Sequence, residues 1–265
     1  MENKLLIYIV TYERMSYTQG TIECLHKTKP ENSQIVVCDN GSTDGTREWL
    51  EENQTKYDLG LIFPEENLRV GGAWTLLTNY YDEGDFDYIL LLDNDGWVLP
   101  KEKDWYEQCV ELFNTDPQIG SLGLQNERKP GYFSMGKTFD PNFNGKISFN
   151  KFECYDTVFF AAFRLDNFKL WHNTMSNWPH KFIGDKIGRH YNHMGYRTVK
   201  ISPGFVVDAS EYNFDNEAHK EYNIDFYKKE RTVEGFKRRL DSHSTSESEK
   251  NYILSNFGEE FLKYL

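Results

Sequence analysis

One run, residues 88–100, constrains the fold of this chain more than any other stretch. It reads Tyr-Ile-Leu-Leu-Leu-Asp-Asn-Asp-Gly-Trp-Val-Leu-Pro, so an apolar run is followed at once by Asp93, Asn94 and Asp95. An apolar run of this length that ends in Asp and Gly is typical of a buried strand in a parallel sheet. Two carboxylates at its carboxyl end predict a site for Mg²⁺ or Mn²⁺ that already carries a phosphate. The alternative interpretation is a turn that only ends the strand.

Three strand–helix units precede this run. Such an alternation predicts βαβ units and therefore a parallel sheet with right-handed crossovers. Ser16 is expected to cap the first helix, and Ser42 or Thr43 the second, with Asp44 in its first turn. The strands are expected at residues 4–11, 33–39 and 59–64. The first helix is expected at residues 16–28, the second from the turn after Asp39 to about residue 54, and the third from the Gly-Gly pair to about residue 81.

Polar side chains stand where these strands end. Thr11 ends the first strand, Asp39 the second, and Asp93 the strand that leads to Asp95. The carboxyl ends of parallel strands meet at one edge of a sheet, which is where open α/β sheets bind ligands. The convergence therefore predicts a cleft for a nucleotide and a metal. Asp39 is either a carboxylate that accepts N–H or O–H from a nucleoside or a turn residue, and Gly72, in a Gly-Gly pair at a helix start, lets the backbone approach a ligand.

The second half of the chain gives weaker signals. Residues 127–151 are read as loops or a hairpin, which could form a flap over the site. Asp185 stands where a helix is expected to begin, so it is either an N-cap or a general base. Further elements are expected as a helix at residues 104–114, strands at 120–125, 155–164 and 197–201, a charged helical stretch from 213 to 240 and a short final helix at 251–265.

Composition excludes several classes of protein. The 30 basic and 42 acidic side chains give a net charge of −12, which argues against general affinity for nucleic acid or anionic membranes, although a local basic patch escapes the average. The four cysteines form no Cys-x-x-Cys pair, so a zinc site or disulfide framework is not expected, and Cys38 is read as inert packing. No stretch resembles a signal peptide or approaches the roughly 18 apolar residues of a membrane span. We therefore expect a cytoplasmic protein.

Four motifs give the chain a resemblance to a known family. They are residues 10–14 (Val-Thr-Tyr-Glu-Arg), 37–46 (Val-Cys-Asp-Asn-Gly-Ser-Thr-Asp-Gly-Thr), 67–74 (Asn-Leu-Arg-Val-Gly-Gly-Ala-Trp) and 91–95 (Leu-Leu-Asp-Asn-Asp). With these motifs the chain resembles the family 2 glycosyltransferases. Their GT-A fold is a Rossmann-like α/β fold, a mostly parallel sheet flanked by helices.

The resemblance implies a domain organisation. A GT-A domain would cover residues 1–212, with a nucleotide-binding half at residues 1–100 and an acceptor-binding half at residues 101–212. A helical C-terminal extension would follow at residues 213–265.

The resemblance also implies which residues bind the donor. Thr11 and Tyr12 would line the nucleoside pocket, with Glu13 in place of a frequent Asn. Asp39 would hydrogen-bond the base, usually uracil in this family, and Arg69 would lie beside it. Gly72 and Asn94 would complete the donor-binding set.

Metal and acceptor roles follow from the same resemblance. Asp93 would contact ribose or sugar, and Asp95 of this Asp-x-Asp (DXD) motif would bind the Mn²⁺ or Mg²⁺ that bridges the diphosphate. Asp208 stands roughly where many members have a further metal-binding His. Asp185 resembles the residue that deprotonates the acceptor, although Gly184 stands where a Glu or Asp often precedes it.

The implied activity is a metal-dependent, inverting transfer of a sugar from a UDP-sugar or other nucleotide-diphospho-sugar to an acceptor hydroxyl. Surface polysaccharide or glycoconjugate synthesis is the default process. A protein or a modified nucleic-acid base is the alternative acceptor, and the basic residues 228–239 are the only hint of the latter. A nucleotidyltransferase is disfavoured because residues 11–20 lack a glycine-rich basic loop, and a catalytically silent nucleotide-sugar-binding protein remains open. The sugar, the linkage and the oligomeric state do not follow from the sequence.

Overall fold

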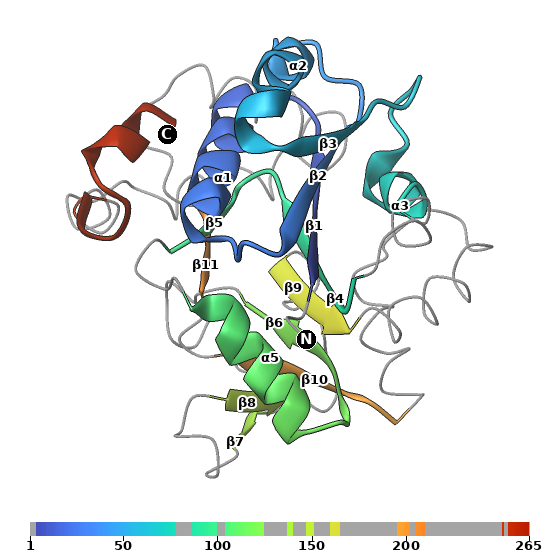
Figure 1. The fold of residues 1–265 in the computed structure, drawn as a ribbon, viewed down its shortest axis with the longest axis vertical. Helices are drawn as coiled ribbons and strands as arrows, with labels where there is room; N and C mark the ends of the chain where they lie inside the picture. The colour runs from blue at the N-terminus through green and yellow to red at the C-terminus, as the bar shows by residue number, and fades with distance from the viewer. Residues whose placement is uncertain are drawn as a thin grey trace, which may run out of the picture.

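The computed structural model describes residues 4–77, 86–99, 104–124, 137–139, 147–150, 160–164, 195–201, 205–209, 251 and 254–264. Within these residues, a nine-stranded sheet of order β3-β2-β1-β4-β9-β6-β10-β8-β7 forms the centre of the molecule (Figure 1). A separate two-stranded ribbon pairs β5 (Gly96–Val98) with β11 (Val206–Asp208). The expected α/β architecture is confirmed.

The N-terminal half forms the parallel part of the sheet. Its strands β3, β2, β1 and β4 are parallel neighbours, and a helix connects each consecutive pair up to β3. The predicted alternation of strands and helices is therefore confirmed. The elements are β1 (Leu5–Thr11), α1 (Met15–Thr28), β2 (Ser33–Asp39), α2 (Thr46–Tyr57), β3 (Leu59–Ile62), α3 (Arg69–Thr75) and β4 (Tyr88–Asp93).

The second half adds strands of mixed direction. Among the described strands of the large sheet, β8 and β9 run opposite to the other seven, so the sheet is mostly parallel. The hairpin of β7 and β8 pairs with β10 and extends the sheet at its edge, so these described strands do not form the flap that we considered. The elements are α5 (Trp105–Thr115), β6 (Ile119–Gly123), β7 (Lys137–Phe139), β8 (Ile147–Asn150), β9 (Phe160–Arg164) and β10 (Arg197–Ile201).

Side chains of β1 alternate between two separate cores. Leu5, Ile7 and Ile9 lie in the core that includes residues of α1, α2 and α5. Leu6 and Tyr8 point to the opposite face, where the core includes Ala73 and Trp74 of α3. Because both faces are covered, these strands are apolar along their whole length, which is why the sequence showed them clearly.

The start of α1 differs from the prediction. The helix begins at Met15, and Arg14 is its N-cap, with φ 63° and no side-chain cap. Ser16, the predicted cap, therefore lies inside the helix. Instead, the Met15 N–H donates to Oδ2 of Asp44, at 2.8 Å, from the turn after β2. A carboxylate that is distant in the sequence caps this helix.

The start of α2 uses the same carboxylate. Gly45, with φ 94°, is the N-cap, so the prediction of Ser42 or Thr43 was wrong. Asp44 lies just before the helix and not in its first turn. Its Oδ1 accepts hydrogen bonds from N and Oγ1 of Thr46, at 3.1 and 2.6 Å. One carboxylate thus caps two helices.

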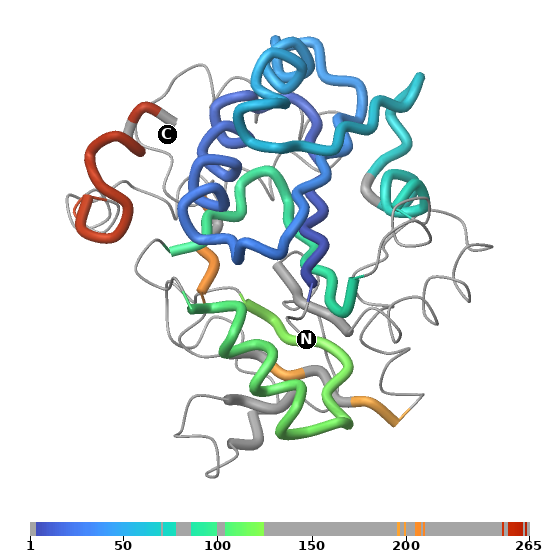
Figure 2. Tube along the Cα trace, in the orientation of Figure 1, coloured from blue at the N-terminus to red at the C-terminus, as the bar shows by residue number. Residues whose placement is uncertain are grey.

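The C-terminal segment packs against the N-terminal half. In Figures 1 and 2 the red segment lies beside α1, and residues of η2 (Glu259–Tyr264) contact that helix. Phe257 and Phe261 pack on Trp97 of β5 (Gly96–Val98), with ring centroids 5.5 and 5.4 Å from the Trp97 ring. Most of the predicted extension, including the basic residues 228–239, lies outside the described residues.

Two further expectations concern membranes and cysteines. No helix among the described residues is long and apolar enough to cross a bilayer. Cys24, Cys38 and Cys109 are buried free thiols, and Cys154 lies outside the described residues. Burial raises the pKa of Cys38 to about 11, which keeps it a thiol at neutral pH and agrees with its role as packing.

Candidate active site

The carboxyl ends of β2, β1 and β4 lie side by side. Thr11 is opposite Asp39 in the β1–β2 pair, and Val10 is opposite Asp93 in the β1–β4 pair. The structure therefore brings these three predicted positions to one edge of the sheet. Asp95 follows directly in the turn between β4 and β5.

Asp39 has two carboxylate oxygens in unlike surroundings. Oδ1 accepts hydrogen bonds from the Ser42 N–H, at 3.3 Å, and from the Ser42 hydroxyl. Oδ2 is buried and has no hydrogen-bond partner among the described residues. Burial raises the pKa of this carboxyl, against the lowering effect of its bonds from Ser42. A buried acceptor without a partner is costly, so it marks a place where a ligand donor would be stabilising.

Thr11 and Asn94 face inward and hold the edge together. The Thr11 and Thr18 hydroxyls are 2.7 Å apart. Asn94 is buried, and its Nδ2 donates to Oγ1 of Thr11 and to the backbone oxygen of Glu13, both at 3.2 Å. Its own backbone oxygen accepts from Oγ1 of Thr21 at 2.8 Å. These contacts give Thr11 and Asn94 a structural role, and their predicted contacts with a donor stay predictions.

Glu13 joins the turn after β1 to the turn after β2. Its N–H donates to Oγ of Ser42, at 2.7 Å, and its Oε1 accepts from N and Oγ1 of Thr43, at 3.0 and 2.8 Å. Both Glu13 and Arg14 have positive φ, of 56° and 63°. The Glu13 carboxylate is thus occupied by Thr43. The half-buried Tyr12 lies between Thr11 and this turn.

Arg69 and Gly72 lie near the same edge. Leu68 donates its N–H to Oδ1 of Asn40 at 2.8 Å, which ties the start of α3 to the residue after Asp39. Arg69 is exposed and begins α3. A Cβ on Gly72 would lie 2.7 Å from Cβ of Leu68, so packing alone requires a glycine there. A contact of Gly72 with a ligand stays a prediction.

Asp95 makes the strongest polar contact at this edge. Its Oδ2 lies 2.7 Å from Nη2 of Arg14, and both side chains are largely buried. Its backbone oxygen accepts the Ala209 N–H at 2.8 Å. In the β5–β11 pair, Asp208 lies opposite Gly96, the residue after Asp95. The structure therefore brings the backbone of Asp208 beside Asp95, although the two are far apart in sequence.

The oxygen donors fit a cation that arrives with its own ligands. No group of three or more His, Cys, Asp or Glu residues within the described part of the chain could hold a metal ion. Mg²⁺ bound to a nucleotide uses one or two carboxylates, with phosphate and water completing the shell. Asp95 and the half-buried Asp93 supply hard oxygens of that kind. The set fits a metal–diphosphate complex and not a closed protein cage.

The general base of the predicted site stays a prediction, and three contacts of the observed site were not predicted. Asp185, the predicted general base, lies outside the described residues. Sequence reasoning missed the roles of Arg14, Thr18 and Ser42. The signal for Arg14 and Thr18 was their closeness to the end of β1, but their contacts depend on the positive φ angles of the turn.

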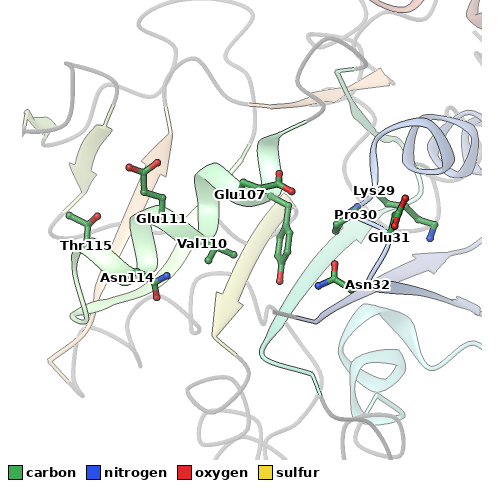
Figure 3. A pocket seen from close by; sticks show the side chains of 10 residues that line it. Lys29, Pro30, Glu31, Asn32, Glu107, Val110, Glu111, Asn114 and Thr115 are labelled. Atoms are coloured by element: carbon green, nitrogen blue, oxygen red, sulfur yellow. The ribbon is translucent and has the colours of Figure 1, made fainter. Parts of the chain in front are cut away.

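A pocket of about 910 Å³ lies elsewhere on the molecule. Figure 3 shows its two sides, residues 29–32 after α1 and the exposed face of α5 with Glu107 and Glu111. The backbone oxygen of Asn32 accepts a hydrogen bond from the N–H of Leu5, where β1 starts. This pocket therefore lies at the opposite edge of the sheet from Asp39 and Asp95. It is separate from the site described above.

The fold is of the GT-A type that is found in glycosyltransferases. The structure is similar to a mannosyltransferase, PcManGT from Pyrobaculum calidifontis, in complex with GDP-Man and Mn²⁺ (TM-score 0.57, 16% identity, 82% of this chain and 59% of that chain). It is also similar to S. aureus TarS 1–349 (TM-score 0.55, 16% identity, 79% and 61% covered). At these identities the likeness shows the fold, and the predicted GT-A fold is confirmed.

The family is established by sequence. The model of the glycosyl transferase family 2 matches residues 6–179, so the chain belongs to that family, as its motifs indicated. A teichoic acid poly(glycerol phosphate) polymerase of Staphylococcus epidermidis is 24% identical over 239 residues, 85% of this chain and 32% of that protein. A poly-beta-1,6-N-acetyl-D-glucosamine synthase of Staphylococcus aureus is 23% identical over 114 residues, 43% and 26%. The chain thus spans less than a third of either curated relative.

Proposed function

We propose that this chain transfers a sugar from a nucleotide-diphospho-sugar to a hydroxyl of a glycan acceptor in the synthesis of a surface polymer. The donor is a UDP-sugar, the reaction depends on a divalent metal, and the anomeric configuration is inverted. The observation that carries the proposal is the buried, unpartnered Oδ2 of Asp39, which shares a sheet edge with Asp93 and Asp95. One ligand with a base at one end and a diphosphate at the other would donate a hydrogen bond to Oδ2 of Asp39 and, through a metal ion, reach the carboxylates of Asp93 and Asp95.

The proposed base follows from the chemistry of Asp39. A carboxylate oxygen only accepts, so it binds a ring nitrogen that carries hydrogen and is repelled by an unprotonated ring nitrogen in the same place. Uracil and guanine have such an N–H, whereas the corresponding ring nitrogens of cytosine and adenine are acceptors. The family resemblance favours uracil. The similar structures support both classes, since one is of PcManGT with GDP-Man and another is of TarS with UDP.

The proposed metal is Mn²⁺ or Mg²⁺. Asp95 would bind this ion, and Asp93 and Asp208 are the proposed further carboxylate ligands. A divalent ion bound there would supply Lewis-acid stabilisation to the charge that grows on the leaving diphosphate. The donor pocket would be formed by the remaining predicted residues, which are Thr11, Tyr12, Glu13, Arg69, Gly72 and Asn94.

Asp185 is the proposed general base. A carboxylate within hydrogen-bond reach can take the proton of the acceptor hydroxyl as the oxygen attacks. A single displacement at the anomeric carbon inverts its configuration, which is also what the family resemblance implies. The names of the relatives, a teichoic acid polymerase and a poly-N-acetylglucosamine synthase, support a surface glycan as the acceptor.

Titration with UDP, with and without Mn²⁺, followed by hydrolysis assays on a panel of nucleotide sugars, tests the proposal. Asp95→Asn should lower metal-dependent turnover by about 100-fold or more, because a ligand to the activating ion is lost. Asp185→Asn should retain UDP binding and lose transfer, and retained transfer would assign the base to another residue. Asp58→Asn is the control, since this exposed residue ends α2, away from the site. Binding of UDP without turnover of any donor would instead indicate a silent binding protein.

A further inference from the structure

Arg14 supplies the positive charge beside Asp95. Its Nη2 lies 2.7 Å from Oδ2 of Asp95, and the side chains of Arg14 and Asp95 are only 19% and 10% exposed. The Arg14 guanidinium also lies over the ring of Tyr17, 4.6 Å from its centroid. The contact is therefore short, partly shielded from water and backed by an aromatic ring, unlike a surface ion pair.

The backbone that carries Arg14 is held in a costly conformation. Glu13 and Arg14 have consecutive positive φ angles of 56° and 63°, a region that residues with side chains rarely adopt because Cβ crowds the backbone there. Contacts to the next turn hold this conformation in place, since Glu13 bonds to Ser42 and Thr43. Strain of this kind persists where the surrounding structure enforces it, and it is concentrated at functional sites. Here it directs a guanidinium at the proposed metal ligand.

A divalent ion and this guanidinium compete for the same oxygen. Two cations on Oδ2 of Asp95 would repel each other strongly, because their separation would be only a few ångströms in a partly desolvated site. A metal ion alone must therefore displace Arg14 without compensation. A metal ion that arrives with a diphosphate brings anionic oxygens, to which a guanidinium binds well through its planar fork of N–H donors.

We propose that Arg14 is a stand-in cation for the metal site. It neutralises Asp95 before the donor binds, and it transfers its hydrogen bonds from Asp95 to the donor's diphosphate when the metal and the nucleotide bind together. This inference rests on the proposed function and deepens it. It makes metal and nucleotide binding cooperative, because each ligand removes a cost that the other would otherwise meet alone.

Mn²⁺ and UDP titrations of an Arg14→Asn variant test the proposal. Asparagine tolerates positive φ, so the turn is preserved while the charge is lost. With Mn²⁺ alone, followed by the paramagnetic resonance signal of the free ion, the variant should bind about fivefold more tightly than the wild type, since a competing ion pair is gone. With saturating Mn²⁺, the variant should bind UDP about tenfold more weakly, since a charged hydrogen bond to phosphate is lost.

Two further variants control the experiment. Arg14→Lys keeps a positive charge without the fork, so it should bind Mn²⁺ like the wild type and UDP more weakly. Lys29→Asn removes a positive charge at the end of α1, beside the pocket at the opposite edge of the sheet from Asp39 and Asp95. It should change neither affinity. Thermal unfolding of each variant without ligands establishes that it is folded.

The outcomes separate the inference from the function on which it rests. A wild-type protein that binds Mn²⁺ and UDP, together with a folded Arg14→Asn variant of unchanged or weaker affinity for Mn²⁺ alone, overturns the role of Arg14 and leaves the proposed function intact. If Arg14→Asn does not fold, Arg14→Lys decides, and unchanged UDP affinity in that variant overturns the role. A wild-type protein that binds no UDP at any Mn²⁺ concentration overturns the proposed function and this inference with it.

Discussion

Among single residues, Asp39 has one carboxylate oxygen with a structural role and one with a proposed role in binding the nucleobase. Its Oδ1 is held by Ser42, and its Oδ2 is buried without a partner among the described residues. An asparagine could keep the first contact through its carbonyl oxygen, but it would present an N–H₂ donor where the second oxygen stands.

Asp39→Asn should therefore change which nucleotide binds. We expect UDP affinity to fall by at least tenfold, because a hydrogen bond to a charged acceptor is typically worth about 1.5–3 kcal/mol. The affinity for CDP should not fall, because the cytosine ring nitrogen accepts from the new donor. Calorimetric titration of both nucleotides measures the ratio. An unchanged ratio of UDP to CDP affinity would show that Asp39 does not contact the base.

The raised pKa of Asp39 predicts a pH dependence. The folded chain holds this proton more tightly than the unfolded chain, so this carboxyl makes the folded state relatively more stable as the pH falls through its raised pKa. The same protonation removes the negative charge of the acceptor and turns one of its oxygens into a donor, so UDP affinity should fall over that pH range. Asp39→Asn should show neither dependence at this position. Unfolding curves and UDP titrations at a series of acidic pH values measure both effects, with Asp58→Asn as the control.

The sequence revealed the carboxylates of the site more readily than their partners. Asp39, Asp93 and Asp95 follow apolar strands directly, and strand ends can be read from periodicity. Arg14 and Ser42 acquire their partners only through the geometry of two turns, and positive φ at residues that are not glycine is not visible in a sequence. The predicted cap at Ser16 was wrong because the hydrogen bond that caps α1 comes from Asp44, in another turn.

At the scale of elements, the short strand β5 was not predicted. Its three residues are too few for a periodic pattern, and it pairs with β11, which lies about a hundred residues further along the chain. The strand packs against α1 at one point of very close approach. A Cβ built on Gly20 would lie 2.5 Å from Cζ2 of Trp97, which is fully buried.

Gly20→Ala should destabilise the protein although alanine favours helices. The gain in helix propensity is about 1 kcal/mol. An overlap with a buried ring that cannot move costs about 1–3 kcal/mol, and here the contact would be far inside normal distances. We expect a net loss of roughly 1 kcal/mol in the free energy of unfolding, measured with urea. Gln19→Ala, at the half-buried neighbouring position, should have a smaller effect, and equal losses would rule out this explanation.

At the scale of the whole molecule, α1 and the C-terminal segment pack together around Trp97. Phe257 and Phe261 cover this ring from the C-terminal segment, and Tyr17 and Cys24 of α1 lie in the same core. Nζ of Lys27, in α1, also lies 3.3 Å from Oε1 of Glu260. Because Trp97 lies two residues after Asp95, the C-terminal segment supports the turn that carries the proposed metal ligand.

Phe261→Ala should weaken both stability and metal–nucleotide binding. Removing a buried phenylalanine costs about 3–5 kcal/mol, and the cavity would lie directly against Trp97. We therefore expect a lower midpoint of thermal unfolding and, at temperatures where the variant is folded, weaker binding of UDP with Mn²⁺. Glu259→Ala, on the exposed side of η2, is the control. Loss of stability with unchanged binding would show that the segment stabilises the fold alone.

The two halves of the molecule differed in how well the sequence predicted them. Strands β1, β2 and β3 follow the local rule that neighbours in sequence are neighbours in space, whereas β4 pairs with β1 on the other side. In the second half, β9 inserts between β4 and β6, and β10 lies between β6 and β8. Such an order is decided by long-range packing, so the individual strands could be predicted but their neighbours could not.

The shared carboxylate of Asp44 links the helices that begin at this edge. Its two oxygens hold the starts of α1 and α2, one next to Arg14 and the other in the segment that follows Asp39. The starts of both helices therefore depend on a single side chain. A redesign that moved either the turn beside the proposed nucleobase position or the turn beside the proposed phosphate position would have to rebuild both.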